Sequence, residues 1–182
     1  MSEKYKFNDP SGIYFVTTTV VGWIDLFTRP ELKHVIIDSL KYCQLQKGMI
    51  IHAWCIMPSH LHLIVSTKGD PLSAILRDFK KFTAKKLVKV INRISESRRG
   101  WLLEFFMDVA NGLNRVADYK VWQDGNHPLL LSTKEMLQQK LDYLHYNPVV
   151  AEIVDEPEEY RYSSARDYYT KKKGPLEIVF IE

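Results

Sequence analysis

Two periodicities of apolar residues divide the first half of the chain into elements. Residues 12–22, GIYFVTTTVVG, are rich in β-branched and aromatic side chains, a composition typical of a strand. Residues 29–48 have apolar side chains at helical spacing, a proline near the start and a closing glycine, which predicts a helix. Residues 49–57 and 60–66 are two apolar runs with only two residues between them, the pattern of a β-hairpin.

Helical spacing returns over residues 70–91, DPLSAILRDFKKFTAKKLVKVI. Its expected buried side carries five apolar residues: Leu72, Ile75, Leu76, Phe79 and Phe82. Strand, helix, hairpin and helix in this order are the beginning of a ferredoxin-like α+β sandwich. We therefore predict an antiparallel sheet with helices on one face.

The pattern is weaker in the second half of the chain. Within residues 95–125 only YKVWQ, residues 119–123, resembles a strand. Residues 132–148 begin with a Ser-x-x-Glu capping box and end at a proline, which predicts an additional C-terminal helix. The final PLEIVFIE, residues 175–182, has the composition of a short strand. With no repeat and no low-complexity linker, we expect one domain over residues 1–182.

Composition limits the class of protein. A chain of 182 residues with 46% hydrophobic and 26% charged residues is ordinary for a globular domain that needs no disulfide or metal to build its core. Cys43 and Cys55 lie in apolar surroundings, so we expect them to be buried hydrophobic residues. The N-terminus lacks an apolar signal region, and no apolar run approaches the roughly 18 residues of a membrane span. We expect a cytoplasmic protein without a membrane partner.

The positive charge is concentrated in one segment. The net charge is only +3, but residues 77–99 contain nine basic and two acidic residues, a local charge of +7. Such a surface suits the phosphate backbone of a nucleic acid, whose condensed counterions are released on binding. A solvated helix whose lysines only provide solubility is the alternative interpretation.

Two histidines stand one residue apart in MPSHLHLIV, residues 57–65. Because side chains alternate along a strand, His60 and His62 share one face and Leu61 and Leu63 share the other. Two imidazoles at this spacing can converge on one metal ion. Structural histidines held by hydrogen bonds are the alternative.

Tyr143 and Asn147 lie one turn apart on the helix predicted over residues 132–148. A tyrosine can act as a nucleophile toward phosphorus, and an amide oxygen can complete the ligand shell of a metal. Packing of the tyrosine and a helix end at Asn147 are the alternatives. Tyr146, on the same helix, is a rival nucleophile.

Five segments in the same order resemble the REP-associated tyrosine transposases, a branch of the HUH superfamily of single-stranded DNA endonucleases and transposases. They are MPSHLHLIV, ILRDFKKFTAKKL, VWQ, LDYLHYNPVV and EYRYSS, and the likeness runs from about residue 12 to residue 168. The resemblance implies that His60 and His62 bind a divalent metal, Mg²⁺ or Mn²⁺. It also implies that Tyr143, on the additional helix, attacks DNA, and that Asn147 falls where the superfamily places a further metal-binding amide.

The implied activity is cleavage and rejoining of single-stranded DNA, associated with hairpins, through a 5′-phosphotyrosine and a free 3′-hydroxyl. The chain departs from the family at Ser59, where asparagine is common, and at Val150, where a basic residue is common. The second departure removes a possible phosphate contact. Two other classes stay open: a non-catalytic nucleic-acid-binding protein derived from a transposase, and a metal phosphodiesterase that uses water.

Further side chains are candidates for contacts with DNA. The basic helix supplies the expected contacts with the backbone, which are Lys80, Lys81, Arg77 and Lys85. Trp54 and Trp122 could stack on unpaired bases or pack in the core. His52 could face the histidine pair or be structural. A monomer and a homodimer both remain possible.

Overall fold

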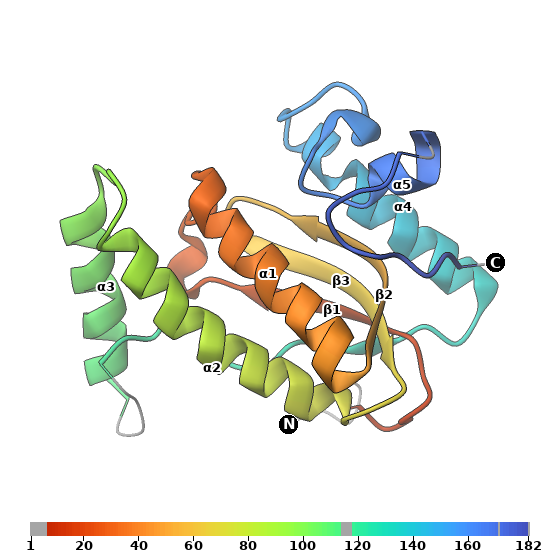
Figure 1. The fold of residues 1–182 in the computed structure, drawn as a ribbon, viewed down its shortest axis with the longest axis horizontal. Helices are drawn as coiled ribbons and strands as arrows, with labels where there is room; N and C mark the ends of the chain where they lie inside the picture. The colour runs from red at the N-terminus through yellow and green to blue at the C-terminus, as the bar shows by residue number, and fades with distance from the viewer. Residues whose placement is uncertain (1–6, 114–117, 171, 182) are drawn as a thin grey trace.

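A four-stranded antiparallel sheet forms the centre of the protein (Figure 1). The computed structural model describes residues 7–113, 118–170 and 172–181. The first six residues of the N-terminal stretch and Glu182, the end of the expected final strand, lie outside this description. The spatial order is β2-β3-β1-β4, which is that of the predicted ferredoxin-like sandwich. The strands are β1 (Tyr14–Thr19), β2 (Met49–Ile56), β3 (His60–Thr67) and β4 (Leu129–Leu130).

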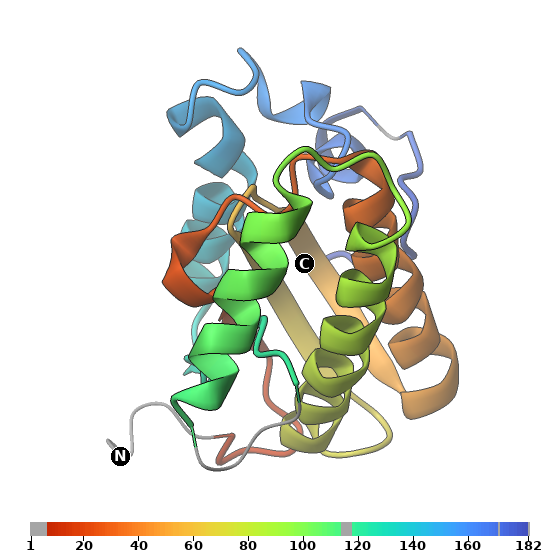
Figure 2. The same cartoon turned by 90° about the vertical axis from the view of Figure 1, so that its left-hand side faces the viewer.

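Helices cover both faces of the sheet. Helices α1 (Pro30–Lys47) and α2 (Leu72–Ile91) lie on one face, and α4 (Lys134–Val150) lies on the other (Figures 1 and 2). Helix α3 (Arg99–Asn111) stands beside α2, at the end of the molecule away from α4 (Figure 1). The short elements are η2 (Val21–Trp23), η3 (Pro157–Glu159) and α5 (Ala165–Thr170). No helix in the described ranges combines the length and apolar character of a membrane span.

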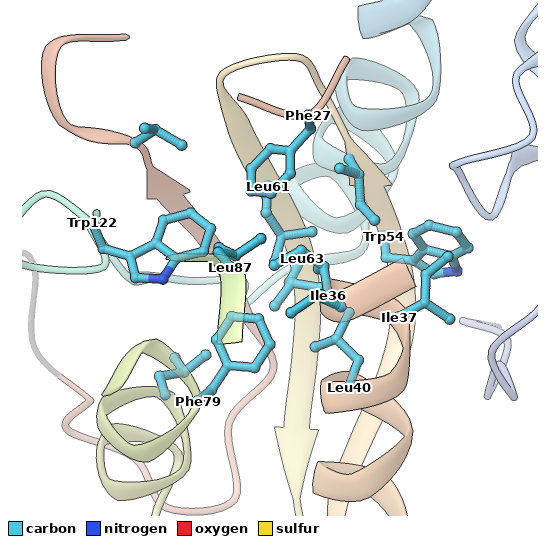
Figure 3. Packing of buried hydrophobic residues seen from close by; sticks show 14 of the residues in the cluster. Phe27, Ile36, Ile37, Leu40, Trp54, Leu61, Leu63, Phe79, Leu87 and Trp122 are labelled. Carbon is cyan, nitrogen blue, oxygen red and sulfur yellow. The ribbon is translucent and has the colours of Figure 1, made fainter. Parts of the chain in front are cut away.

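Two apolar clusters hold the layers together, and burial of their surface from water drives this packing. Figure 3 shows Leu61 and Leu63 of β3 packed with Ile36 of α1 and Phe79 of α2 in the larger cluster. The smaller cluster joins the other face of the sheet to α4 through side chains such as Phe15, Ile64 and Leu144. The predicted division of β3 into a leucine face and a histidine face is therefore confirmed. Cys43 and Cys55 are buried and free, as expected.

The junction between α1 and β2 depends on a glycine. Gly48 ends α1 with φ of 71°, in the left-handed region, and its N–H donates to the Cys43 carbonyl. A β-carbon at this position would lie 2.7 Å from the backbone nitrogen of Gly69. Gly48 therefore lets the chain turn directly from the helix into β2.

Helix α4 differs from its prediction at both ends. Its N-cap is Thr133, whose hydroxyl accepts the N–H of Met136 at 3.2 Å, and not Ser132. At the other end the helix continues through Pro148 to Val150. Proline removes only its own N–H, and the turn that follows is closed by bonds such as Ala151 N–H to the Asn147 carbonyl.

Three expectations for other elements are wrong. Phe82 is 59% exposed, because Thr83 takes the next place on the buried stripe of α2. Residues 119–123 form no strand, although Trp122 makes an isolated bridge with Val20. The C-terminal residues run beside β2, with Val179 N–H donating to the Ile51 carbonyl, but no strand is formed among those described.

Candidate active site

Strand pairing places His62 in the middle of the sheet. It lies opposite Thr17 of β1 on one side and Cys55 of β2 on the other. This row of paired residues is extended on both sides. Cys55 forms a β-bridge with Ser163, and the Thr17 N–H donates to the Asn126 carbonyl. The candidate site therefore has a rigid floor of hydrogen-bonded backbone.

The His62 side chain is almost completely enclosed, with 3% of its surface exposed. Its Nδ1 lies 2.9 Å from the Thr17 hydroxyl, and its ring stacks on Phe15 with centroids 5.3 Å apart. Its Nε2 is buried and has no hydrogen-bond partner within the described part of the chain. Burial, with smaller contributions from His60 and Lys140, lowers the pKa of His62 to about 3, so the imidazole is neutral at physiological pH.

His60 has a similar arrangement one step along β3. Its Nδ1 lies 3.0 Å from the Ser59 hydroxyl, and its ring centroid is 4.6 Å from that of His62. Burial lowers the pKa of His60, although Asp25 partly opposes the effect. In both histidines a hydroxyl can accept a hydrogen bond from Nδ1–H, and this tautomer leaves a lone pair on Nε2.

Tyr143 comes from α4, and its ring lies against that of His62. Its ring centroid is 5.4 Å from that of His62 and 5.9 Å from that of Phe15, and the residue is 49% exposed. The Lys140 ammonium lies 5.2 Å from the centroid of each of the Phe15 and Tyr143 rings. The structure thus brings together three of the predicted site residues: the exposed phenol of Tyr143 lies beside His62, and His62 lies beside His60.

Two other candidates, Asn147 and Tyr146, also lie on α4. The side chain of half-buried Asn147 makes no hydrogen bond in the described ranges. Tyr146 is 48% exposed, and among the described residues its ring contacts neither histidine. The described residues also hold no cluster of three or more His, Cys, Asp or Glu side chains that could bind a metal ion. From these residue types, the imidazoles of His60 and His62 are the available ligands.

A buried hydrogen-bond network fixes α4 relative to the sheet. His145 Nε2 lies 2.9 Å from the Ser164 hydroxyl, which also accepts the Trp54 N–H at 3.0 Å. The Ser164 N–H donates to the Trp54 carbonyl at 2.9 Å. Because Trp54 belongs to β2 and β2 pairs with β3, the network sets the position of Tyr143 relative to the histidines.

The four basic residues expected to contact DNA lie on α2 in different environments. Lys80 donates to the carbonyls of Gln123 and Gly125, and burial lowers its pKa to about 8. Arg77 donates to its neighbour Asp78. Lys81 and Lys85 are exposed and line, with Lys80, a groove of about 520 Å³ between α2 and residues 118–124.

Some sequence expectations are settled by burial. Trp54 and Trp122 are core residues, 0% and 4% exposed, so neither can stack on a base. His52 is structural, because its Nδ1 lies 2.9 Å from the Val179 carbonyl and its Nε2 lies 2.9 Å from the Ser66 hydroxyl.

The site also contains residues that the sequence did not indicate, namely Phe15, Thr17, Trp23 and Lys140. The sequence could have indicated them only through their position relative to the histidine pair in the strand register, or to Tyr143 by helical spacing.

Comparison with known proteins finds a similar fold and a matching family model. One solved structure, described as a REP-associated tyrosine transposase bound to a REP hairpin, is similar with a TM-score of 0.62. The likeness covers 100% of this chain and 95% of that one at 20% identity, so it concerns the fold. The search of curated proteins gives no match. A family model described as "Transposase IS200 like" matches residues 24–119, more than half of the sequence. The chain belongs to the IS200-like transposase family.

Proposed function

We propose that this protein cleaves and rejoins single-stranded DNA, with Tyr143 as the nucleophile. The observation that carries the proposal is the contact of the Tyr143 ring with the ring of His62, whose buried Nε2 has no hydrogen-bond partner in the described chain. The similar solved structure is described as bound to a REP hairpin, which supports hairpin DNA as the substrate. Because the site draws on β1, β3 and α4, residues 1–182 act as one domain in this proposal.

His60 and His62 would hold a divalent metal, Mg²⁺ or Mn²⁺. Their neutral imidazoles and hydroxyl-bonded Nδ1 atoms fit this role, since a metal ligand must offer an unprotonated nitrogen. A metal with several water ligands, as Mg²⁺ usually has, needs few protein ligands. When bound, it would stabilise negative charge on the phosphoryl oxygens as a Lewis acid.

The chemistry assigned to Tyr143 is a transfer of the phosphoryl group between oxygens. The phenolic oxygen, having given its proton to solvent, forms a bond to phosphorus, while the bond from phosphorus to the 3′ oxygen breaks. The departing oxygen takes up a proton, and the products are a 5′-phosphotyrosine and a 3′-hydroxyl. One phosphodiester-type bond replaces another, so a second 3′-hydroxyl can reverse the step.

The test is covalent trapping. The protein is incubated with Mn²⁺ and hairpin oligonucleotides that have randomised single-stranded flanks and a 3′-end label, because the downstream fragment stays on the tyrosine. We expect a slow band on a denaturing gel that disappears with Tyr143→Phe and persists with Tyr146→Phe. Disappearance with Tyr146→Phe alone would assign the nucleophile to Tyr146. Cleavage without a band would favour the water-using phosphodiesterase, and binding without cleavage would favour the non-catalytic module.

A further inference from the structure

A line of aromatic side chains extends from the histidine pair to α3. The Trp23 ring meets His60 edge to face, with centroids 5.6 Å apart. Its neighbour Gly22 lies against Phe105, whose ring would be 2.7 Å from a β-carbon at residue 22. Phe105 stacks in turn on Trp101, with centroids 5.8 Å apart and an interplanar angle of 22°. Figure 2 shows η2 next to α3. Trp23, Phe105 and Trp101 are called the aromatic line below.

The aromatic line is open to solvent at both ends. Trp23 is 61% exposed and Trp101 is 52% exposed, so neither indole is a core side chain. Trp54 and Trp122, in contrast, are core residues. Large apolar side chains that remain exposed together indicate a surface for binding.

The backbone of Trp23 is strained. Its φ is 56°, a conformation that costs free energy for any residue with a β-carbon. The strain is held in place because the Trp23 N–H donates to the Val20 carbonyl and the Val21 N–H donates to the Val121 carbonyl. A strained residue with an exposed side chain adds little to the stability of the fold, so stability does not explain why the strain is kept. Strain of this kind is concentrated at functional sites.

An exposed basic side chain lies near the aromatic line. Arg98 and Arg99 are separated from Trp101 by Gly100. Arg98 is paired with Glu96, whereas the Arg99 guanidinium donates to the Ile94 carbonyl and is exposed. The line therefore pairs flat aromatic faces with positive charge, which is the combination found where proteins bind unpaired nucleotides. A polyanion complements this charge.

We propose that the aromatic line binds successive unpaired bases of single-stranded DNA, starting with the base beside the phosphate at His60. This inference rests on the proposed function, because it takes DNA as the substrate. Stacking on an aromatic face does not depend on base identity. The aromatic line would thus place the strand without reading its sequence.

The test measures binding to two probes, labelled dT20 and a labelled 20-base-pair duplex, by fluorescence anisotropy in the presence of EDTA. Loss of one stacking residue typically weakens binding to a single strand by about fivefold to 100-fold. We expect Trp23→Ala to weaken binding of dT20 in this range and to leave duplex binding unchanged, whereas Trp23→Phe retains most of the affinity. Tyr42→Ala is the control, because Tyr42 is 57% exposed on α1 and lies outside the aromatic line.

The inference is overturned if Trp23→Ala binds dT20 as tightly as the wild type does. It is equally overturned if the variant loses affinity for dT20 and for the duplex to the same extent. It is also overturned if the wild type self-associates and Trp101→Ala abolishes that association, since a second copy would then occupy this surface. The covalent band with Mn²⁺ tests the proposed function separately. A band without the Trp23 effect removes only the inference, and the Trp23 effect without a band removes only the proposed cleavage.

Discussion

At the scale of single residues, two hydroxyl groups determine what the histidine pair can do. Thr17 and Ser59 each lie within hydrogen-bond distance of an Nδ1, on His62 and His60 respectively. Ser59 is the position where the family commonly has asparagine, and its hydroxyl can still accept a hydrogen bond from the imidazole. These side chains would orient both rings so that the Nε2 atoms are available to a metal.

Thr17→Val tests this role of the hydroxyl. Loss of a hydrogen bond that orients a metal ligand typically weakens metal binding or activity by about 10-fold to 100-fold, and we expect a loss of this size in a calorimetric Mn²⁺ titration. Thr18→Val is the matched control, because the buried Thr18 hydroxyl has no hydrogen-bond partner in the described chain. Equal effects of the two substitutions would show that Thr17 does not orient the ligand.

His62→Ala separates chemistry from binding. It removes one of the two available imidazole ligands, so we expect metal-dependent cleavage to disappear. DNA affinity should be largely unchanged, because contacts with phosphates dominate affinity. Gel shift and cleavage assays on the same hairpins provide the comparison. A parallel loss of binding and cleavage would make His62 a structural residue.

The strained backbone at Trp23 gives a third prediction. Trp23→Gly and Trp23→Ala both remove the indole, but only glycine adopts φ of 56° without strain. We expect the glycine variant to be more stable than the alanine variant by about 1 kcal/mol in urea unfolding. If the two have equal stability, the left-handed backbone at this position stores no strain.

At the scale of elements, α4 matters through its attachment to β2. The Ser164 hydroxyl contacts both His145 of α4 and the Trp54 N–H of β2 in a buried environment. Buried polar groups that lose their partner carry the full cost of desolvation. The serine therefore links the helix with the nucleophile to the sheet with the histidines.

Ser164→Ala should leave His145 Nε2 and the Trp54 N–H without this partner. We expect a loss of about 2 kcal/mol or more in the free energy of unfolding, measured with urea. The yield of the covalent band should also fall although Tyr143 is intact. The control is Ser132→Ala, an exposed change outside this network that should have little effect on either measurement. A stable Ser164 variant with full activity would rule out the linking role.

The sequence predicted the elements from β1 to α2 well, because proline, glycine and a change of apolar period mark each boundary. Helix α3 was missed, since neither a typical capping residue nor a proline marks its start after Arg98, and its apolar residues Trp101 and Met107 are exposed. His60, His62 and Tyr143 could be singled out by motif. Thr17 and Lys140 could not, because their roles arise from strand register and from packing between distant segments.

At the scale of the whole molecule, buried neutral histidines make stability depend on pH. His145 is completely buried, which lowers its pKa to about 4, and burial also lowers the pKa of His52, although a hydrogen bond to Val179 opposes the effect. Both residues attach C-terminal segments to the sheet or to α4. Below a pH of about 6.5 the unfolded chain takes up protons that the folded protein excludes.

We therefore expect the free energy of unfolding to be highest above a pH of about 6.5 and to fall as the pH decreases toward about 4. Urea unfolding at a series of pH values measures this dependence. His52→Gln removes one titrating group, so its stability should change less with pH than that of the wild type. A flat profile for the wild type over this range would show that these histidines titrate alike in both states.

The order of the strands also affects how the protein is made. β1 and β3 come from the first part of the chain, whereas α4 follows much later. During synthesis the segments of β1, β2 and β3 leave the ribosome before the tyrosine helix, and a single domain folds as a unit once its segments are available. The nascent chain would then hold both histidines without the proposed nucleophile. Cleavage of DNA would begin only after the last structural layer has closed over the sheet.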